Sequence, residues 1–102
     1  MFHAKLTGRL MDTPEVKKGK TGKLYCTVSL VLYVKNMRTY IRLVAFEDDT
    51  KLFDGFQKSD RVHVEGGVIQ IQYNGRPDIQ VAITSIEIAK EEVPVDEVDE
   101  AA

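Results

Sequence analysis

The chain has few of the residues that build covalent or metal-held frameworks. Among its 102 residues are one cysteine, Cys26, two histidines and no tryptophan. A single thiol cannot form a disulfide within the chain, and one thiol with two scattered histidines lacks the ligand spacing of a metal site. We therefore expect no disulfide, no metal and no cofactor.

Long hydrophobic runs are also missing. Residues 1–10 alternate polar and apolar side chains and include Lys5 and Arg9. They therefore have neither the apolar core of a signal peptide nor the length of a spanning segment. The composition, 43% hydrophobic and 29% charged, is typical of one soluble globular domain. We expect a cytoplasmic protein with no membrane partner.

The net charge is only −2, and its sign argues against nucleic acid until it is divided along the chain. Residues 91–102 hold six acids and no base, whereas residues 1–46 hold nine bases and two acids. A basic half of this kind is typical of a protein that binds a polyanion through one region. The last twelve residues have too few apolar side chains to fold, so we expect an acidic flexible tail after a domain at residues 1–90.

Five segments of that domain have the patterns of β-strands. Apolar and polar side chains alternate, and turn signals separate the segments. Gly66-Gly67 predicts a bulge in the fourth strand, and Asn74-Gly75 predicts a hairpin turn after it. The expected strands are residues 2–11, 24–34, 39–46, 61–73 and about 78–89.

One short helix is expected between the third and fourth strands. Asp48 or Asp49 would cap it, and Leu52, Phe53 and Phe56 would form its apolar stripe. Three strands, a helix and two strands follow the order of the OB-fold, a five-stranded barrel. We therefore expect an all-β OB-fold barrel whose open end the stripe covers, with other small barrels as the alternative. The order alone fixes no ligand.

The outward face of the barrel carries an aromatic and cationic row. Alternation places Tyr40, Arg42 and Phe46 on the face opposite the apolar residues at positions 41, 43 and 45. Phe46 fits a core position equally well. Such a row suits nucleobases, because rings stack on any base and arginine adds cation–π contact. Tyr25 and Tyr33 share the outward face of the preceding strand, where they fit a ligand site or a subunit interface.

Four segments resemble the bacterial and phage single-stranded DNA-binding proteins. Gly-Arg-Leu at residues 8–10 with Pro-Glu-Val-Lys at 14–17 is similar to the family's opening strand and turn, and Val-Ser-Leu at 28–30 to its second strand. Residues 40–46 are similar to its third strand. Arg-Val-His-Val-Glu-Gly at 61–66 matches the family's Arg-Val-x-Val-Glu-Gly before a long hairpin. The resemblance covers most of the expected barrel.

The resemblance implies binding of single-stranded DNA with little sequence preference, in replication, recombination or repair. It assigns base stacking to Tyr40, Phe46 and Tyr73, places Arg42 on the same sheet, and implies a homo-oligomer with replication or recombination proteins as partners. Tyr33 and the basic residues of loops and hairpin tips complete the candidate DNA-binding set. These basic residues, suited to phosphate contacts, are Lys17, Lys18, Lys20, Lys23, Lys35, Arg38 and Arg76. Residues 17–23 are expected to form a flexible basic loop, which a solvated excursion would also explain.

The chain departs from the family in four ways. It has no tryptophan, which lowers the expected affinity, and a connection at residues 35–38 shorter than the family's basic loop, which implies a smaller footprint. Ile41 stands where many members have a histidine at a subunit contact, so a tetramer and a dimer both stay open. Its final residues lack the Pro-Phe that commonly ends family tails, which leaves recruitment of partner proteins open.

No pattern of an enzyme is present. The stretch at residues 19–24 resembles a phosphate-binding loop, but Lys17 stands at its first required glycine and Leu24 at its required serine or threonine. We therefore expect a protein that is not an enzyme. Two alternatives to DNA coating stay open: a primosomal OB protein that bridges replication proteins, and a protein-interaction barrel that binds no nucleic acid.

Overall fold

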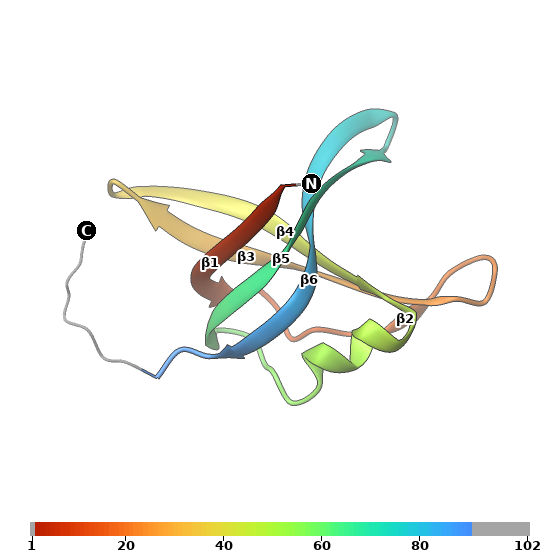
Figure 1. The fold of residues 1–102 in the computed structure, drawn as a ribbon, viewed down its shortest axis with the longest axis horizontal. Helices are drawn as coiled ribbons and strands as arrows, with labels where there is room; N and C mark the ends of the chain where they lie inside the picture. Colours follow the sequence, from red (N-terminus) through yellow and green to blue (C-terminus); the bar gives the residue numbers. More distant parts are fainter. Residues whose placement is uncertain (1, 91–102) are drawn as a thin grey trace.

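Strands make up most of the chain, as the alternating sequence predicts. The computed structural model describes residues 2–90, and the expected acidic tail at residues 91–102 lies outside them. Only the second strand is absent from the sequence prediction. The elements are β1 (His3–Leu10), β2 (Lys17–Lys18), β3 (Leu24–Val34), β4 (Met37–Phe46), the 3-10 helix η1 (Glu47–Phe53), β5 (Arg61–Tyr73) and β6 (Arg76–Ile88) (Figure 1).

Two pairings that the order of the chain does not reveal close the sheet into a barrel. The strand order is β1-β5-β6-β4-β3-β2, and the end of β1 also pairs with β3, with Arg9 opposite Val31. β4 runs parallel to β6 over three residue pairs, from Arg42 opposite Gln80 to Val44 opposite Ala82. Five strands therefore form a closed barrel with η1 between β4 and β5, which confirms the expected OB-fold.

Glycine is required at two points where strands approach closely. A Cβ atom on Gly8 would lie 2.2 Å from the carbonyl oxygen of Val31, where β1 passes from β5 to β3. A Cβ atom on Gly66 would lie 2.3 Å from the carbonyl oxygen of Ala82. The β5–β6 register shifts between Glu65 and Gly66, which confirms the expected bulge.

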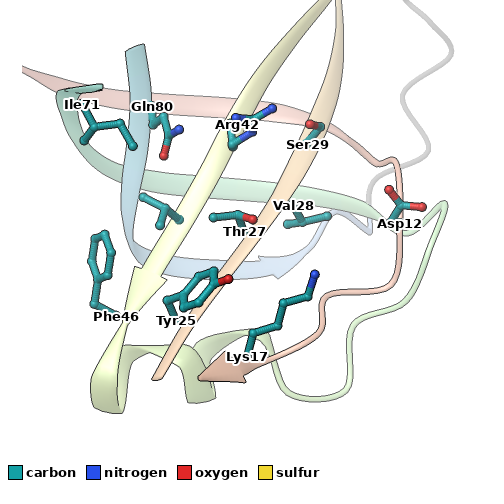
Figure 2. Close-up of a pocket in the computed structure, with 11 residues that line it drawn as sticks. Asp12, Lys17, Tyr25, Thr27, Val28, Ser29, Arg42, Phe46, Ile71 and Gln80 are labelled. Carbon is teal, nitrogen blue, oxygen red and sulfur yellow. The ribbon is translucent and has the colours of Figure 1, made fainter. Parts of the chain in front are cut away.

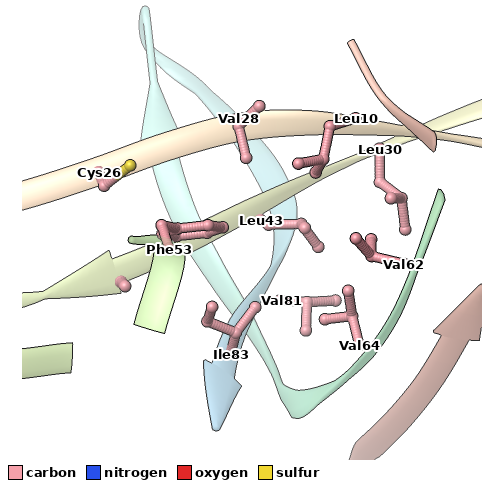
Figure 3. Packing of buried hydrophobic residues seen from close by; sticks show 11 residues of the cluster. Leu10, Cys26, Val28, Leu30, Leu43, Phe53, Val62, Val64, Val81 and Ile83 are labelled. Atoms are coloured by element: carbon pink, nitrogen blue, oxygen red, sulfur yellow. The ribbon is translucent and has the colours of Figure 1, made fainter. Parts of the chain in front are cut away.

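Apolar side chains from all five barrel strands and η1 fill the interior (Figure 3). Burying one aliphatic side chain of this size contributes about 1.5–3 kcal/mol, so the cluster determines which face of each strand points outward. Burial raises the pKa of the Cys26 thiol, which lies in the core. The cluster consists of Leu10, Cys26, Val28, Leu30, Leu43, Ala45, Phe53, Val62, Val64, Val81 and Ile83.

The helix η1 covers one end of the barrel, against β3, β4 and β6. Phe53 is buried, and Leu52 and Phe56 pack on the core, so the apolar stripe is confirmed. The expected cap is wrong. Asp48 and Asp49 lie within the first turn, because the last residue of β4 takes the cap position, and no side chain caps the helix. Within residues 2–90, no helix is long and apolar enough to cross a bilayer.

Two-residue turns join β3 to β4 and β5 to β6. Asn74 and Gly75 have φ angles of 53° and 78°, the left-handed backbone of a type I′ turn, which confirms the Asn-Gly signal. Lys35 and Asn36, with φ angles of 51° and 68°, form the other turn. The expected four-residue connection is therefore wrong, because β4 begins at Met37 and pairs from there with β3.

The basic segment at residues 17–23 forms part of a hairpin. The two residues of β2 pair with Leu24 and Tyr25, and the N–H of Gly19 donates to the carbonyl oxygen of Lys23 at 2.8 Å. The expected loop is therefore wrong at Lys17 and Lys18, which pair with β3, and residues 19–23 form the turn between the two strands. We call residues 17–25 the β2–β3 arm. It holds the lysines on an ordered backbone.

Candidate nucleic-acid interface

The outer surface of β3 and β4 carries two rows of side chains in register. Residues of the opposite parity, such as Leu30 and Leu43, lie in the core, so these rows point away from it. At about 3.3 Å per residue, Tyr25 and Tyr33 lie about 26 Å apart along β3. We call this surface the β3–β4 face. Its pairs are Tyr25 with Phe46, Thr27 with Val44, Ser29 with Arg42, Val31 with Tyr40 and Tyr33 with Arg38.

One half of the β3–β4 face is the floor of a groove of about 510 Å³ (Figure 2). Lys17 of the β2–β3 arm borders the groove, and Ile71 and Gln80 reach it from the β5–β6 hairpin. Segments far apart in the sequence therefore enclose one site. The floor consists of Tyr25, Thr27, Ser29, Arg42, Val44 and Phe46.

An aromatic pair, Tyr25 and Phe46, stands at one end of the groove. Phe46 is 48% exposed, so of the two placements open for it the structure has the outward one. Tyr25 is half-buried. The same two residues border a second hollow, which Thr21 and Lys23 of the β2–β3 arm also line. The pair therefore separates two hollows that a flat ring could enter from either side.

A second aromatic cluster lies where β3 and β4 extend past the barrel. Tyr33 and Tyr40 are 66% and 50% exposed. The pKa of the Arg38 guanidinium is raised above its ordinary value, first by a hydrogen bond with Tyr33 and then by electrostatic interaction with Tyr33 and Tyr40. Arg38, charged at neutral pH like any arginine, thus lies beside two phenol rings. We call Tyr33, Arg38 and Tyr40 the distal cluster.

Arg42 lies between the two aromatic groups and is oriented by β6. Its Nη1 is 3.5 Å from Oδ2 of Asp78, and both side chains are about one-third exposed. The same carboxylate oxygen accepts a hydrogen bond of 2.9 Å from Nε2 of Gln80. Asp78 thus holds one cation and one amide at the edge of the groove. A guanidinium in this position can reach a phosphate or the edge of a base.

The other candidate basic residues occupy three separate places. Only Lys17 borders the groove; Lys18 is the next residue of β2 and faces the opposite side. Lys20 and Lys23 are exposed on the β2–β3 arm. Lys35 lies in the β3–β4 turn, next to the distal cluster. The lysines therefore flank both ends of the β3–β4 face.

The tip of the β5–β6 hairpin holds the last two candidates. Tyr73 is the final residue of β5 and pairs with Arg76, the first residue of β6. The Tyr73 side chain lies outside the described part of the structure. Arg76 is exposed and lines a shallow hollow with Asn74 and Asp78. Asp78 is shared between this hollow and the Arg42 ion pair, so the hairpin tip adjoins the groove.

Most residues that line the groove are absent from the sequence-based set, and two of them, Tyr25 and Gln80, have side chains suited to contact a base. Tyr25 had a signal, since it shares the outward parity of Tyr33. Gln80 had none, because it reaches the groove only through the parallel pairing of β4 with β6. No cluster of three or more His, Cys, Asp or Glu side chains suited to a metal occurs among residues 2–90.

Comparison with known proteins adds no relative. No protein-family model matches the chain, and no curated protein matches it. The fold and the β3–β4 face therefore carry the functional argument.

Proposed function

We propose that this protein binds single-stranded DNA along the β3–β4 face with little sequence preference. The observation that carries the proposal is the register of that face. It sets the pair Tyr25 and Phe46 at one end, the distal cluster at the other, and Arg42 between them. Rings and guanidinium groups alternate over about 26 Å. In OB-folds generally, the corresponding strands and the flanking loops are the ligand-binding surface.

The aromatic side chains of the β3–β4 face favour the binding of unpaired bases over that of a duplex. Each base stacked on an aromatic ring contributes about 1–3 kcal/mol whatever its identity, because every base has a π-face. A duplex buries those faces in its own stack, so it cannot use the rings. Phe46, Tyr33 and Tyr40 are each about half exposed or more, so their ring faces are open to stacking.

The lysines support a phosphate path beside the bases. Lys17, Lys20 and Lys23 stand on the β2–β3 arm next to the pair Tyr25 and Phe46. Each phosphate that a cation neutralises on a single strand adds about 0.7 to the slope of log affinity against log salt. A strand that follows the face from the arm to the distal cluster would therefore bind with strong salt dependence.

The biological setting rests on the resemblance to single-stranded DNA-binding proteins. We infer a non-enzymatic cytoplasmic protein that protects or presents single-stranded DNA in replication, recombination or repair. It acts as a homo-oligomer, either dimer or tetramer, with replication or recombination proteins as partners. The same resemblance assigns base stacking to Tyr73.

One observation favours a second candidate, a barrel that bridges proteins. Val34 and Met37 pair on the reverse side of the distal cluster and are 53% and 69% exposed. An exposed apolar pair on a projecting hairpin suits contact with another protein. The double substitution of Val34→Ser with Met37→Ser separates the two functions, because it would weaken protein contact and leave DNA affinity unchanged.

A fluorescence titration tests the proposal. The chain has four tyrosines and no tryptophan, so tyrosine emission reports directly on the proposed stacking residues. We expect oligo-dT to quench it, a duplex of equal length to leave it nearly unchanged, and the affinity to fall steeply with salt. Single-stranded RNA in the same assay tells whether the face selects DNA. Absence of quenching by oligo-dT at low salt would overturn the proposal.

A further inference from the structure

Gln80 presents an unused hydrogen-bond acceptor at the groove. The residue is 1% exposed and lines the groove beside Arg42 and Ile71 (Figure 2). Its Nε2 donates to Asp78, whereas its Oε1 has no hydrogen-bond partner within the described structure. A buried acceptor without a partner raises the free energy of the unliganded state, and a donor supplied by a ligand would recover that free energy.

Asp78 fixes which way the Gln80 amide faces. A carboxylate only accepts hydrogen bonds, so the amide nitrogen must face it and the amide oxygen must face the other way. Flipping the amide would bring two acceptors together and lose the 2.9 Å hydrogen bond. Asp78 is itself held by Arg42. The orientation of Oε1 as an acceptor is therefore a built feature of the site.

We propose that Gln80 gives one nucleotide position in the groove a preference for a base that carries an exocyclic amino group. This inference rests on the proposed binding of single-stranded DNA. Cytosine has an N4 amino donor at the position where thymine and uracil have the acceptor O4. The one edge donor of thymine and uracil, N3–H, lies between two carbonyl oxygens. Gln80 therefore favours cytosine over either of the other pyrimidines at that position.

Access to Oε1 requires movement of a neighbouring side chain, because the atom is shielded from solvent in the unliganded protein. Ile71 and Arg42 flank Gln80 in the groove, and both are only partly buried (Figure 2). Ile71 can turn aside and leave space beside the amide, while Arg42 keeps its contact with Asp78. The hydrogen bond to the base then forms on binding.

The test is a cycle of two proteins and two oligonucleotides. Oligo-dC and oligo-dU of equal length are titrated against the parent protein and against Gln80→Met, which has a similar volume and only a weakly accepting sulfur. Differences in backbone flexibility or stacking between the oligonucleotides cancel in the cycle. We expect the ratio of dC to dU affinity to fall about fivefold in the variant, the value of one neutral hydrogen bond.

A second variant tests the inference without touching Gln80. Asp78→Ala removes the carboxylate that orients the amide, which can then flip and present Nε2 to O4 of uracil. The dC to dU ratio should fall in this variant too, and circular dichroism checks the fold of both. Unchanged ratios in the folded variants would overturn the base preference while oligonucleotide binding persists. If the parent protein binds neither oligonucleotide, the proposed function itself is overturned.

Discussion

The two ends of the β3–β4 face differ in how much protein surrounds them. Tyr25 and Phe46 lie between residues 17–23 of the β2–β3 arm and the β5–β6 hairpin, beside an arginine already held by Asp78. The distal cluster stands on a hairpin whose strands pair only with each other beyond Val31. A positioned site loses less side-chain freedom on binding than an exposed one. We therefore expect the groove end to contribute more affinity and the distal end to be more tolerant of sequence.

The largest effect is expected at the groove end. Phe46→Ala removes a proposed stacking ring that borders both hollows, so affinity for oligo-dT should fall about 30-fold, or ~2 kcal/mol. Anisotropy of a labelled oligonucleotide measures the loss. Met37→Ala is the matched control, because Met37 is an exposed apolar residue of the same strand on the reverse side. Equal losses in the two variants would contradict the assignment of the face.

At the distal end, Tyr40→Ala should have a smaller effect. Tyr40 lines neither of the two hollows that Phe46 borders, so we expect a loss of about fivefold, near the lower limit of stacking. The thermal midpoint should stay close to that of the parent, because the side chain is outside the core. A loss larger than that of Phe46→Ala, in the same anisotropy assay, would reverse the order of the two ends.

An intermediate change of opposite sign is expected at Asp78. Asp78→Asn keeps an oxygen that accepts from Arg42 and removes a negative charge from the edge of the groove. Affinity for oligo-dT should rise about two- to threefold at low salt, since an exposed charge contributes less than about 1 kcal/mol. The gain should disappear at high salt. Weaker binding by this variant would mean that positioning of Arg42 outweighs the repulsion.

The smallest effect is expected on the β2–β3 arm. Lys20 lies in the turn of the arm and outside the groove, so Lys20→Ala should barely change affinity at high salt. The slope of log affinity against log salt should become shallower by about 0.7, the value of one phosphate. Titrations at four or more salt concentrations give the slope. An unchanged slope would remove Lys20 from the phosphate path.

Local patterns predicted most of the barrel. Alternation located β3 at its observed bounds. The Gly66 bulge and the Asn74-Gly75 turn were predicted because glycine and asparagine adopt backbone conformations that other residues rarely adopt. The β2 strand and the start of β4 were missed. Three of the four missed residues, Lys17, Lys18 and Arg38, are charged, so they show no apolar alternation. Their strand structure comes from pairing with β3, which a pattern within one segment does not record.

The candidate site could be predicted only in part, because contacts between distant strands leave no pattern within one segment. Alternation placed Tyr40, Arg42 and Phe46 on one outward face, because parity is a property of a single strand. The enclosure of that face depends on contacts across the barrel. Gln80 lies next to Arg42 through a parallel pairing between residues 38 positions apart. Neighbours of this kind follow from the closed fold and not from any segment of it.

The short parallel pairing of β4 with β6 has a further consequence for how the barrel responds to an occupant. Only three residue pairs join these two strands, and Arg42 and Gln80 are the first of them. A ligand that contacts both side chains would bridge one of the two shortest junctions of the barrel wall and hold the two strands together. Ligand binding would then stabilise the closed barrel, so the thermal midpoint of the bound protein would be higher than that of the free protein.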